Sequence, residues 1–198
     1  MRPDSLARPE YVAAFVALAR RIEQSLIGVS KRALPIRMYV AGGAALHLYT
    51  GARVSRDIDA TFSRRIALPE NLEIAYRDAD GAARLLYFDR QYNDTFGLLH
   101  EDALDDSEPL SLPEIDAAVL EVRLLSPVDL ATSKLGRFSD QDREDIETLA
   151  RRKLIDATML RKRAEAALAG YVGDTKRLQA ALETACRIVA DATKRRGK

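Results

Sequence analysis

The sequence predicts an α/β fold: a small mixed β-sheet flanked by helices, followed by a helical C-terminal region. Two observations predict it. Before Pro127, short apolar segments with strand-like composition alternate with turn residues and helical patterns. After Pro127, apolar residues recur only at helical spacing. We therefore divide the chain into an α/β core, residues 1–126, and a helical region, residues 127–198.

The first predicted element is an amphipathic helix from Arg8 to Ile27. Its apolar residues recur every three or four positions, and charged residues such as Arg20 and Arg21 occupy much of the other face. These charges interrupt the apolar pattern, so we expect no signal peptide. Gly28 can end the helix. The apolar positions are Val12, Phe15, Val16, Leu18, Ala19, Ile22 and Leu26.

A strand, a glycine turn, a helix and a second strand follow in close order. Ile36–Ala41 is short, apolar and rich in strand-forming residues, and Gly42-Gly43 interrupts it. Ala44–Tyr49 has the composition of a short apolar helix. In Asp57–Phe62, polar and apolar residues alternate, which predicts a half-buried strand.

The remaining strands of the core are predicted from three segments. Leu72–Arg77 and Arg84–Asp89 enclose the turn sequence Asp78-Ala79-Asp80-Gly81, so we expect a hairpin. The polar stretch from Asp89 to Pro113 has no clear pattern, and Ala118–Leu125 is the last strand.

Four helices are predicted in the C-terminal region. Ser126 has the side chain that favours an N-cap, so a short helix is expected over Val128–Leu135. Longer helical patterns cover Gln141–Arg152, Asp156–Ala169 and Asp174–Thr193.

Composition limits the classes of function. The formal net charge of +1 gives no overall basic field that would indicate nucleic-acid binding. The single cysteine, Cys186, cannot form an internal disulfide, so we expect a reducing, cytoplasmic setting and a buried thiol. The apolar runs are shorter than the ~20 residues that a membrane-spanning helix needs, and no membrane association is expected.

Asp57 and Asp59 are the strongest candidates for chemistry. Side chains two apart on a strand point to the same face, with Cα atoms ~7 Å apart, so both carboxylates project together. Their mutual repulsion is relieved by a divalent cation, and Mg²⁺ is commonly held by one or two carboxylates together with substrate phosphates. One or two Mg²⁺ ions are therefore expected here, as in enzymes of phosphoryl transfer.

Gly42-Gly43 predicts a phosphate site beside this pair. Two glycines between a strand and a helix let the backbone approach a ligand closely. The N–H groups at the start of the helix, expected at Ala44 and Ala45, and its positive dipole end favour an anion. Two strands joined by one helix can lie side by side, so the phosphate site would face the carboxylates.

Two motifs in this order resemble a known family. The run from Tyr39 to Arg53, followed by Ser55-Arg56-Asp57-Ile58-Asp59, resembles the signature of the polymerase-β-like nucleotidyltransferase superfamily. Within it, the chain is similar to bacterial AbiEii-like toxin–antitoxin nucleotidyltransferases. Their second signature resembles Ser133-Lys134-Leu135-Gly136-Arg137 and the later run from Asp142 to Ile146.

The resemblance implies a nucleotidyltransferase-like fold and Mg²⁺-dependent transfer of a nucleotidyl group from an NTP to a tRNA end or a protein hydroxyl. It also implies a cognate antitoxin or toxin as a partner. Asp57 and Asp59 would bind Mg²⁺, Lys134 would meet phosphate, and Asp142 or Asp145 would organise the arginines. The nucleotide-binding residues would be Gly42, Gly43, Ala44, Ser55, Arg56, Lys134 and Arg137, with Arg143 orienting substrate.

The sequence also departs from the family pattern. Ala44 stands where the superfamily often has a serine that helps to hold phosphate. The third carboxylate has no distinctive motif, and we take Glu121 as the first candidate and Asp89 as the second. These departures favour, as an alternative, a degenerate module that binds a nucleotide or a partner.

A third hypothesis is modification of an aminoglycoside-like small molecule. Its cationic acceptor would be held by Asp94, Glu101 and Asp102. His47, in the helix behind the glycines, is expected to pack rather than to bind a metal.

Overall fold

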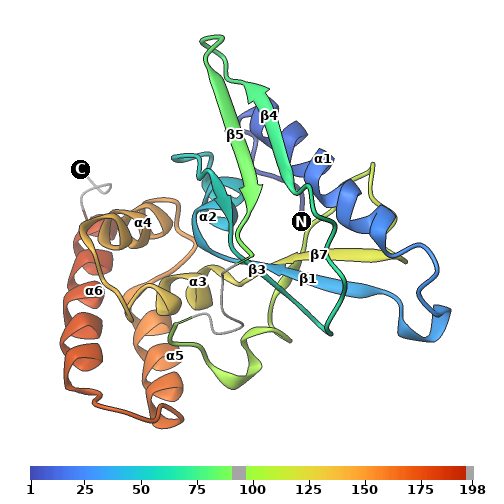
Figure 1. Cartoon of the computed structure of the whole chain (residues 1–198). Helices are drawn as coiled ribbons and strands as arrows, with labels where there is room; N and C mark the ends of the chain where they lie inside the picture. Colours follow the sequence, from blue (N-terminus) through green and yellow to red (C-terminus); the bar gives the residue numbers. More distant parts are fainter. Residues whose placement is uncertain (91–96, 195–198) are drawn as a thin grey trace. The chain divides into compact units, whose positions relative to one another are not determined.

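The computed structural model describes residues 1–90 and 97–194, and it divides the chain into two compact units. Unit 1 comprises Met1–Asp94 and Ser107–Leu124, and unit 2 comprises Thr95–Asp106 and Leu125–Lys198. Unit 1 contains the β-sheets, and the long helices of the C-terminal region lie in unit 2 (Figure 1). The predicted α/β fold with a helical C-terminal region is confirmed. Residues 97–106, which the sequence placed in the core, group with the helices.

A four-stranded mixed sheet forms the first layer of unit 1, in the order β3-β1-β7-β6. β1 (Ile36–Val40) is central: β3 (Ala60–Phe62) runs antiparallel to it on one side and β7 (Leu120–Leu124) runs parallel on the other. β6 (Glu108–Pro109) adds to β7 at the edge. In β7 buried apolar residues alternate with less buried polar ones, whereas in the central strand β1 every residue except Arg37 is buried.

A three-stranded sheet forms the second layer, in the order β2-β5-β4. β4 (Glu73–Arg77) and β5 (Ala83–Phe88) form the predicted hairpin, and β2 (Asp57–Ile58) runs parallel to β5. The Asp78 carboxylate closes the turn, since its Oδ1 accepts hydrogen bonds from the N–H groups of Asp80 and Ala82 at 3.1 and 2.9 Å.

The predicted strand Asp57–Phe62 is interrupted at Asp59. Before Asp59 the chain pairs with β5 in one sheet, and after it the chain pairs with β1 in the other. The Asp59 carbonyl accepts a hydrogen bond from the N–H of Ala41, 2.8 Å away. Asp59 therefore lies where the two sheets meet.

The N-terminal helix α1 (Pro9–Ser25) packs alongside β4 and β5 (Figure 1). Proline at the first helical position suits the start of a helix. The sequence identified the helix and most of its buried positions, but Val12 and Val16 are half-exposed and Tyr11, which it did not name, is fully buried. A short turn, η1 (Lys31–Ala33), precedes β1. The buried residues of α1 are Tyr11, Ala14, Phe15, Leu18, Ala19 and Ile22.

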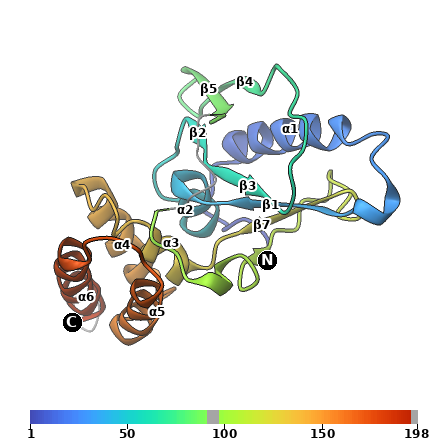
Figure 2. The ribbon, with the colours of Figure 1, turned by 60° about the horizontal axis from the view of Figure 1, so that its bottom comes forward.

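The helices of unit 2 follow the predicted order. α3 (Pro127–Ser133) is capped by Ser126, and α4 (Asp140–Arg151) begins with a capping box formed by Ser139 and Asp142. α5 (Ala157–Ala169) and α6 (Lys176–Lys194) lie side by side in both views (Figures 1 and 2).

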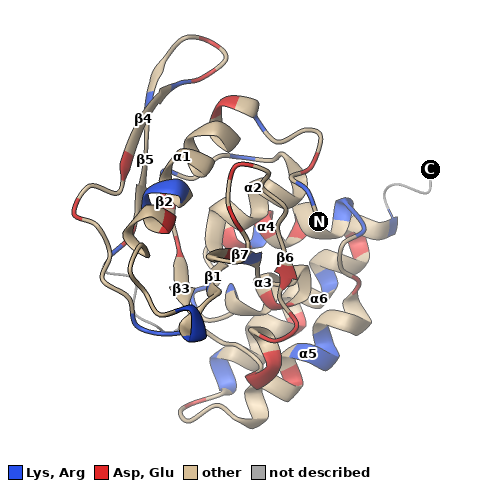
Figure 3. Ribbon diagram, turned by 90° about the vertical axis from the view of Figure 1, so that its right-hand side faces the viewer, with Lys and Arg blue, Asp and Glu red and all other residues tan. Residues whose placement is uncertain are grey.

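Two further properties of unit 2 bear on the predictions. The single cysteine, Cys186, is buried on α6, as the sequence predicted. Both basic and acidic residues are distributed over these helices (Figure 3). The short turn η2 (Glu101–Ala103) also belongs to this unit. Over the described residues, no helix combines the length and the apolar character that a membrane crossing requires.

Candidate active site

The glycine pair opens α2 (Gly42–Thr50), the short buried helix of unit 1. The N–H of Ala45 donates to the carbonyl of Ala41 at 3.2 Å, which is the first bond of the helix. The expectation that Ala45 offers a free N–H is therefore wrong. By helical geometry the N–H groups without an intrahelical acceptor are those of Gly42, Gly43 and Ala44, one residue earlier than predicted.

Gly42 lies directly against the Asp59 carboxylate. A Cβ at position 42 would be 1.8 Å from Asp59 Oδ2 and 2.8 Å from its Cγ. The backbone φ of Gly42 is +59°, in the left-handed region that favours glycine. Two features favour glycine here, and the contact with Asp59 shows that an acidic side chain lies at the N-terminus of α2.

Gly43 is required by two further polar side chains. A Cβ there would be 2.8 Å from Ser55 Cβ, 3.0 Å from Ser55 Oγ and 3.1 Å from Arg53 Nη1. Arg53 and Ser55 come from the segment between α2 and β2. The structure therefore brings Gly42, Gly43, Ser55 and Asp59 together, as the sequence predicted, and adds Arg53.

Asp57 joins the same group through Ser55. The Ser55 hydroxyl donates a short hydrogen bond to Asp57 Oδ1. The other oxygen, Oδ2, accepts no hydrogen bond from the described residues. Arg56 is exposed, and its carbonyl accepts from the N–H of Tyr87 at 2.8 Å, so its backbone takes part in the sheet.

Tyr11 is a residue of this region that the sequence reasoning missed. Its side chain is fully buried, and its burial raises the pKa of the phenol; the nearby Tyr76, Asp57 and Asp59 raise it further, whereas Arg53 opposes them. The hydroxyl therefore stays protonated. Leaving a buried hydroxyl without a partner costs about 1–3 kcal/mol. In the described part of the chain, the Tyr11 hydroxyl is the one buried side-chain oxygen or nitrogen that makes no hydrogen bond.

His47 packs as predicted and connects α2 to α1. Its Nδ1 lies 2.6 Å from the carbonyl of Ala52, and its Nε2 accepts from the N–H of Arg8 at 3.0 Å. Because Nε2 accepts, the ring is neutral, and burial lowers the pKa of His47 in agreement. The ring of Tyr11 stands edge-on to it, with the centroids 4.7 Å apart.

The two candidates for a third carboxylate lie in different surroundings. Glu121, on β7, accepts hydrogen bonds from Arg37 Nε at 3.1 Å and from Arg123 Nη1 at 2.5 Å. Asp89 follows the last residue of β5, and its N–H donates to the carbonyl of Ile58 at 3.2 Å. Continuing the β2–β5 register by one residue puts Asp89 beside Asp59.

The chemistry of the carboxylate pair fits a magnesium ion shared with a phosphate ligand. Among residues 1–90 and 97–194, no group of three or more His, Cys, Asp or Glu side chains is arranged to hold a metal ion alone. Mg²⁺ commonly uses only one or two protein carboxylates and takes its other ligands from phosphates and water. Asp57 and Asp59 supply that number of carboxylates next to the helix N-terminus.

The second motif forms a buried ionic cluster in unit 2. Lys134 Nζ lies 2.6 Å from Asp145 Oδ2 and 3.7 Å from Asp142 Oδ1, and all three side chains are buried. Gln141 donates to the other oxygen of Asp145 at 3.2 Å. The predicted roles of Lys134 at phosphate and of the two acids as organisers stay predictions, but the cluster already satisfies the ammonium.

Arg137 and Arg143 flank this cluster at the surface. Arg137 donates from Nε and Nη2 to the two oxygens of Asp142, each at 2.8 Å. Burial alone would raise the pKa of Asp142, but Arg137, Ser139 and Lys134 together hold it well below its usual range. Arg143 pairs with Asp140 at 3.1 Å and lies over the ring of Phe138.

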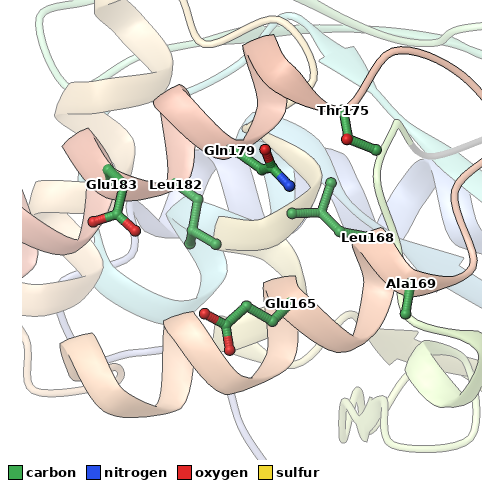
Figure 4. A pocket seen from close by; sticks show the side chains of 7 residues that line it. All are labelled: Glu165, Leu168, Ala169, Thr175, Gln179, Leu182 and Glu183. Carbon is green, nitrogen blue, oxygen red and sulfur yellow. The ribbon is translucent and has the colours of Figure 1, made fainter.

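A hollow of about 530 Å³ lies between α5 and α6, and none of the motif residues lines it (Figure 4). Its acidic residues, Glu165 and Glu183, both lie near Arg161, at 3.6 and 2.5 Å. We therefore do not regard it as the site. Of the acids considered for a cationic acceptor, Asp94 lies outside the described residues, and Glu101 and Asp102 are exposed in η2.

Comparison with known proteins identifies the family of the chain. Residues 17–190 match the family described as "Nucleotidyltransferase of unknown function (DUF6036)". Because the match spans most of the chain, the chain belongs to this family. No curated protein matches the sequence.

Proposed function

We propose that this member of the nucleotidyltransferase family transfers an NMP group from an NTP to an acceptor hydroxyl, with Mg²⁺ held by Asp57 and Asp59. One observation carries the proposal: the Asp59 carboxylate lies against the backbone of Gly42, where an added Cβ would be 1.8 Å from its Oδ2. An acid at the N-terminus of a helix that also attracts phosphate is the arrangement that a metal-bound triphosphate requires.

The reaction proposed is displacement at the α-phosphorus of the NTP. The acceptor oxygen forms a bond to that phosphorus, the bond to the bridging oxygen of the β-phosphate breaks, and pyrophosphate leaves. The N–H groups of Gly42, Gly43 and Ala44 offer hydrogen bonds to the triphosphate, and Arg53 offers a positive charge beside them. Bound Mg²⁺ would neutralise the charge on the phosphates.

The acceptor proton requires a base, and we assign this role to Asp89. The strand register supports Asp89 because it continues β5 next to Asp59. Glu121 is less suited, since the guanidinium groups of Arg37 and Arg123 already bind its two oxygens. Positioning and charge neutralisation would supply most of the acceleration.

For the acceptor, we propose an RNA end or a protein hydroxyl, as the resemblance to toxin–antitoxin nucleotidyltransferases implies. A cognate partner protein follows from the same resemblance. Ala44 in place of serine removes one hydrogen bond to phosphate, worth about 0.5–1.5 kcal/mol, but leaves the backbone N–H groups available.

The proposal is tested by incubating the protein with Mg²⁺ and each α-labelled NTP, together with total RNA or cell lysate. Label should appear in RNA or protein with the wild type and with Asp80→Asn, a control at the exposed tip of the β4–β5 turn. Asp57→Asn and Asp59→Asn should lose the transfer. Equal labelling by all four proteins would contradict the proposal.

Two other functions are separated by the same experiment. Metal-dependent NTP binding without transfer to any acceptor would favour a binding module. Ala44, which stands where the superfamily often has serine, is the reason to consider this alternative. Labelling of an aminoglycoside, with RNA and protein left unlabelled, would favour a small-molecule transferase.

A further inference from the structure

The hydroxyl of Tyr11 is an unusual feature of unit 1, because it is buried next to charged groups and yet makes no hydrogen bond. The side chain has no exposed surface, and in the described chain no other buried side-chain polar atom lacks a partner. Such groups are rare in native proteins, and each one calls for an explanation.

The packing around Tyr11 fixes its ring. The rings of His47 and Tyr76 stand edge-on to it, with centroids 4.7 and 6.3 Å away. His47 is itself fixed by the backbone at both nitrogens. The hydroxyl is therefore held in place and cannot readily turn toward water.

The ring packs against His47 on α2, the helix whose N-terminus forms the candidate site. Asp57 and Asp59 both act on its ionisation, Asp57 the more strongly, and Arg53 acts in the opposite direction. The phenol remains protonated and is a donor. Asp57 has an available acceptor, because Ser55 occupies only its Oδ1.

We propose that Tyr11 is a positioning residue for the metal-binding carboxylates, whose hydroxyl donates a hydrogen bond to Asp57 when that carboxylate binds a metal ion. This inference rests on the proposed function. Carboxylates that bind a metal are commonly held by such outer hydrogen bonds, which orient them toward the ion. The hydroxyl, without a partner in the metal-free protein, gains one when the site is loaded.

Removing the Tyr11 hydroxyl should therefore affect the metal-free protein and the metal-loaded protein differently. Tyr11→Phe keeps the ring and its contacts but removes the hydroxyl. In the metal-free protein nothing is lost, so the urea midpoint should stay the same or rise. In the loaded protein a hydrogen bond to Asp57 is lost, and Mg²⁺–ATP should bind roughly 10–100-fold more weakly.

The test measures the urea midpoint without metal and the dissociation constant of Mg²⁺–ATP by calorimetry, for the wild type, Tyr11→Phe, Asp57→Asn and Tyr76→Phe. Tyr76→Phe is the matched control, since it removes a neighbouring phenol hydroxyl that is half-exposed, and it should change neither quantity. A structural role for the Tyr11 hydroxyl would instead lower the urea midpoint, and that result would overturn the inference.

Failure of this inference is distinguishable from failure of the proposed function. If Asp57→Asn abolishes binding and Tyr11→Phe binds as tightly as the wild type, the role of Tyr11 is wrong and the proposed function stands. If the wild type binds Mg²⁺ with none of the four NTPs, both are wrong.

Discussion

The two motif regions of this chain contain similar charged residues, but these residues differ in how far they bond to one another. In unit 2, Lys134, Asp142 and Asp145 are buried and bonded to one another, and Arg137 completes the group. In unit 1, Asp57 has an oxygen without a hydrogen bond from the described residues, and beside it the Tyr11 hydroxyl has no partner.

The difference indicates which charges support the fold and which await a ligand. A buried ion pair whose members satisfy each other is costly to separate, so its residues are held in place. Polar groups that are buried without partners lower stability, and they persist where a ligand completes them. On this criterion, we expect the proposed chemistry at the group of Gly42 and Asp57, and we expect the Lys134 cluster to stabilise unit 2.

The largest expected effect comes from Gly42→Ala. A Cβ at this position would meet Asp59 Oδ2 at 1.8 Å, so the carboxylate must turn away from the helix N-terminus. Displacement of a catalytic group by about 1 Å can cost roughly 10²-fold, and transfer activity should fall by at least that factor. The measurement is the initial rate of label transfer with Mg²⁺ and NTP.

Gly81→Ala is the matched control for this variant. Gly81 has a φ of +78°, in the same left-handed region, but an added Cβ meets nothing within 4 Å. Both variants should lose about 1–2 kcal/mol of folding free energy from backbone strain. If Gly81→Ala reduced activity as strongly as Gly42→Ala, strain rather than the contact with Asp59 would be the cause.

The next largest effect is expected in the buried ionic cluster of unit 2. Lys134→Met removes the ammonium and leaves two buried carboxylates without it, which should destabilise the protein by about 3–5 kcal/mol. The double variant with Asp145→Leu removes the stranded charge, so it should be more stable than the single variant. Urea unfolding of the wild type, both single variants and the double variant measures the coupling. Additive losses would show that the pair does not act as a unit.

The sequence predicted the type and order of the main elements because local signals determine them. Apolar periodicity located α1 and the helices after Pro127, and turn residues located the β4–β5 hairpin. The juxtaposition of Gly42 with the Asp57–Asp59 segment also followed from local pattern, since a strand, a turn and a helix leave few ways to arrange the next strand.

Tertiary contacts determine what the sequence could not supply. At Asp59 the chain passes from one sheet to the other. An alternating pattern of polar and apolar residues does not reveal that the partner strand changes there. Tyr11 was overlooked because Val12 and Val16 fit the helical period equally well, and only packing against His47 decides which side is buried. The spacing of Tyr11, Phe15, Leu18 and Ile22 was the available signal.

A smaller effect is expected at Asp142, and it depends on pH. Replacement by asparagine should cost about 1.5–3 kcal/mol at pH 7, because charge-assisted hydrogen bonds from Arg137 and Ser139 are lost. The pKa of Asp142 is lowered in the folded protein, so its stabilisation is complete above the unfolded pKa of about 3.9 and is lost as pH falls below it.

Urea midpoints between pH 7 and pH 3 check this dependence. Wild type and Asp140→Asn, a neighbouring control whose side chain is 94% exposed, should lose stability along the same course in acid. Asp142→Asn should show a shallower loss. Parallel curves for all three proteins would mean that other carboxylates carry the acid sensitivity.

The smallest effect is expected from Ser55→Ala, a substitution in the candidate site of unit 1. Ser55 donates to Asp57 Oδ1 and orients that carboxylate, and one such bond contributes about 0.5–1.5 kcal/mol. Mg²⁺–ATP should therefore bind roughly 2–12-fold more weakly. Ser133→Ala, which removes a hydroxyl bonded to the carbonyl of Leu130 in unit 2, should leave the dissociation constant unchanged. If Ser133→Ala weakened binding as much as Ser55→Ala, the division of the chain's charges into a structural and a ligand-binding group would fail, because polar groups in unit 2 would then contribute to the nucleotide site as well.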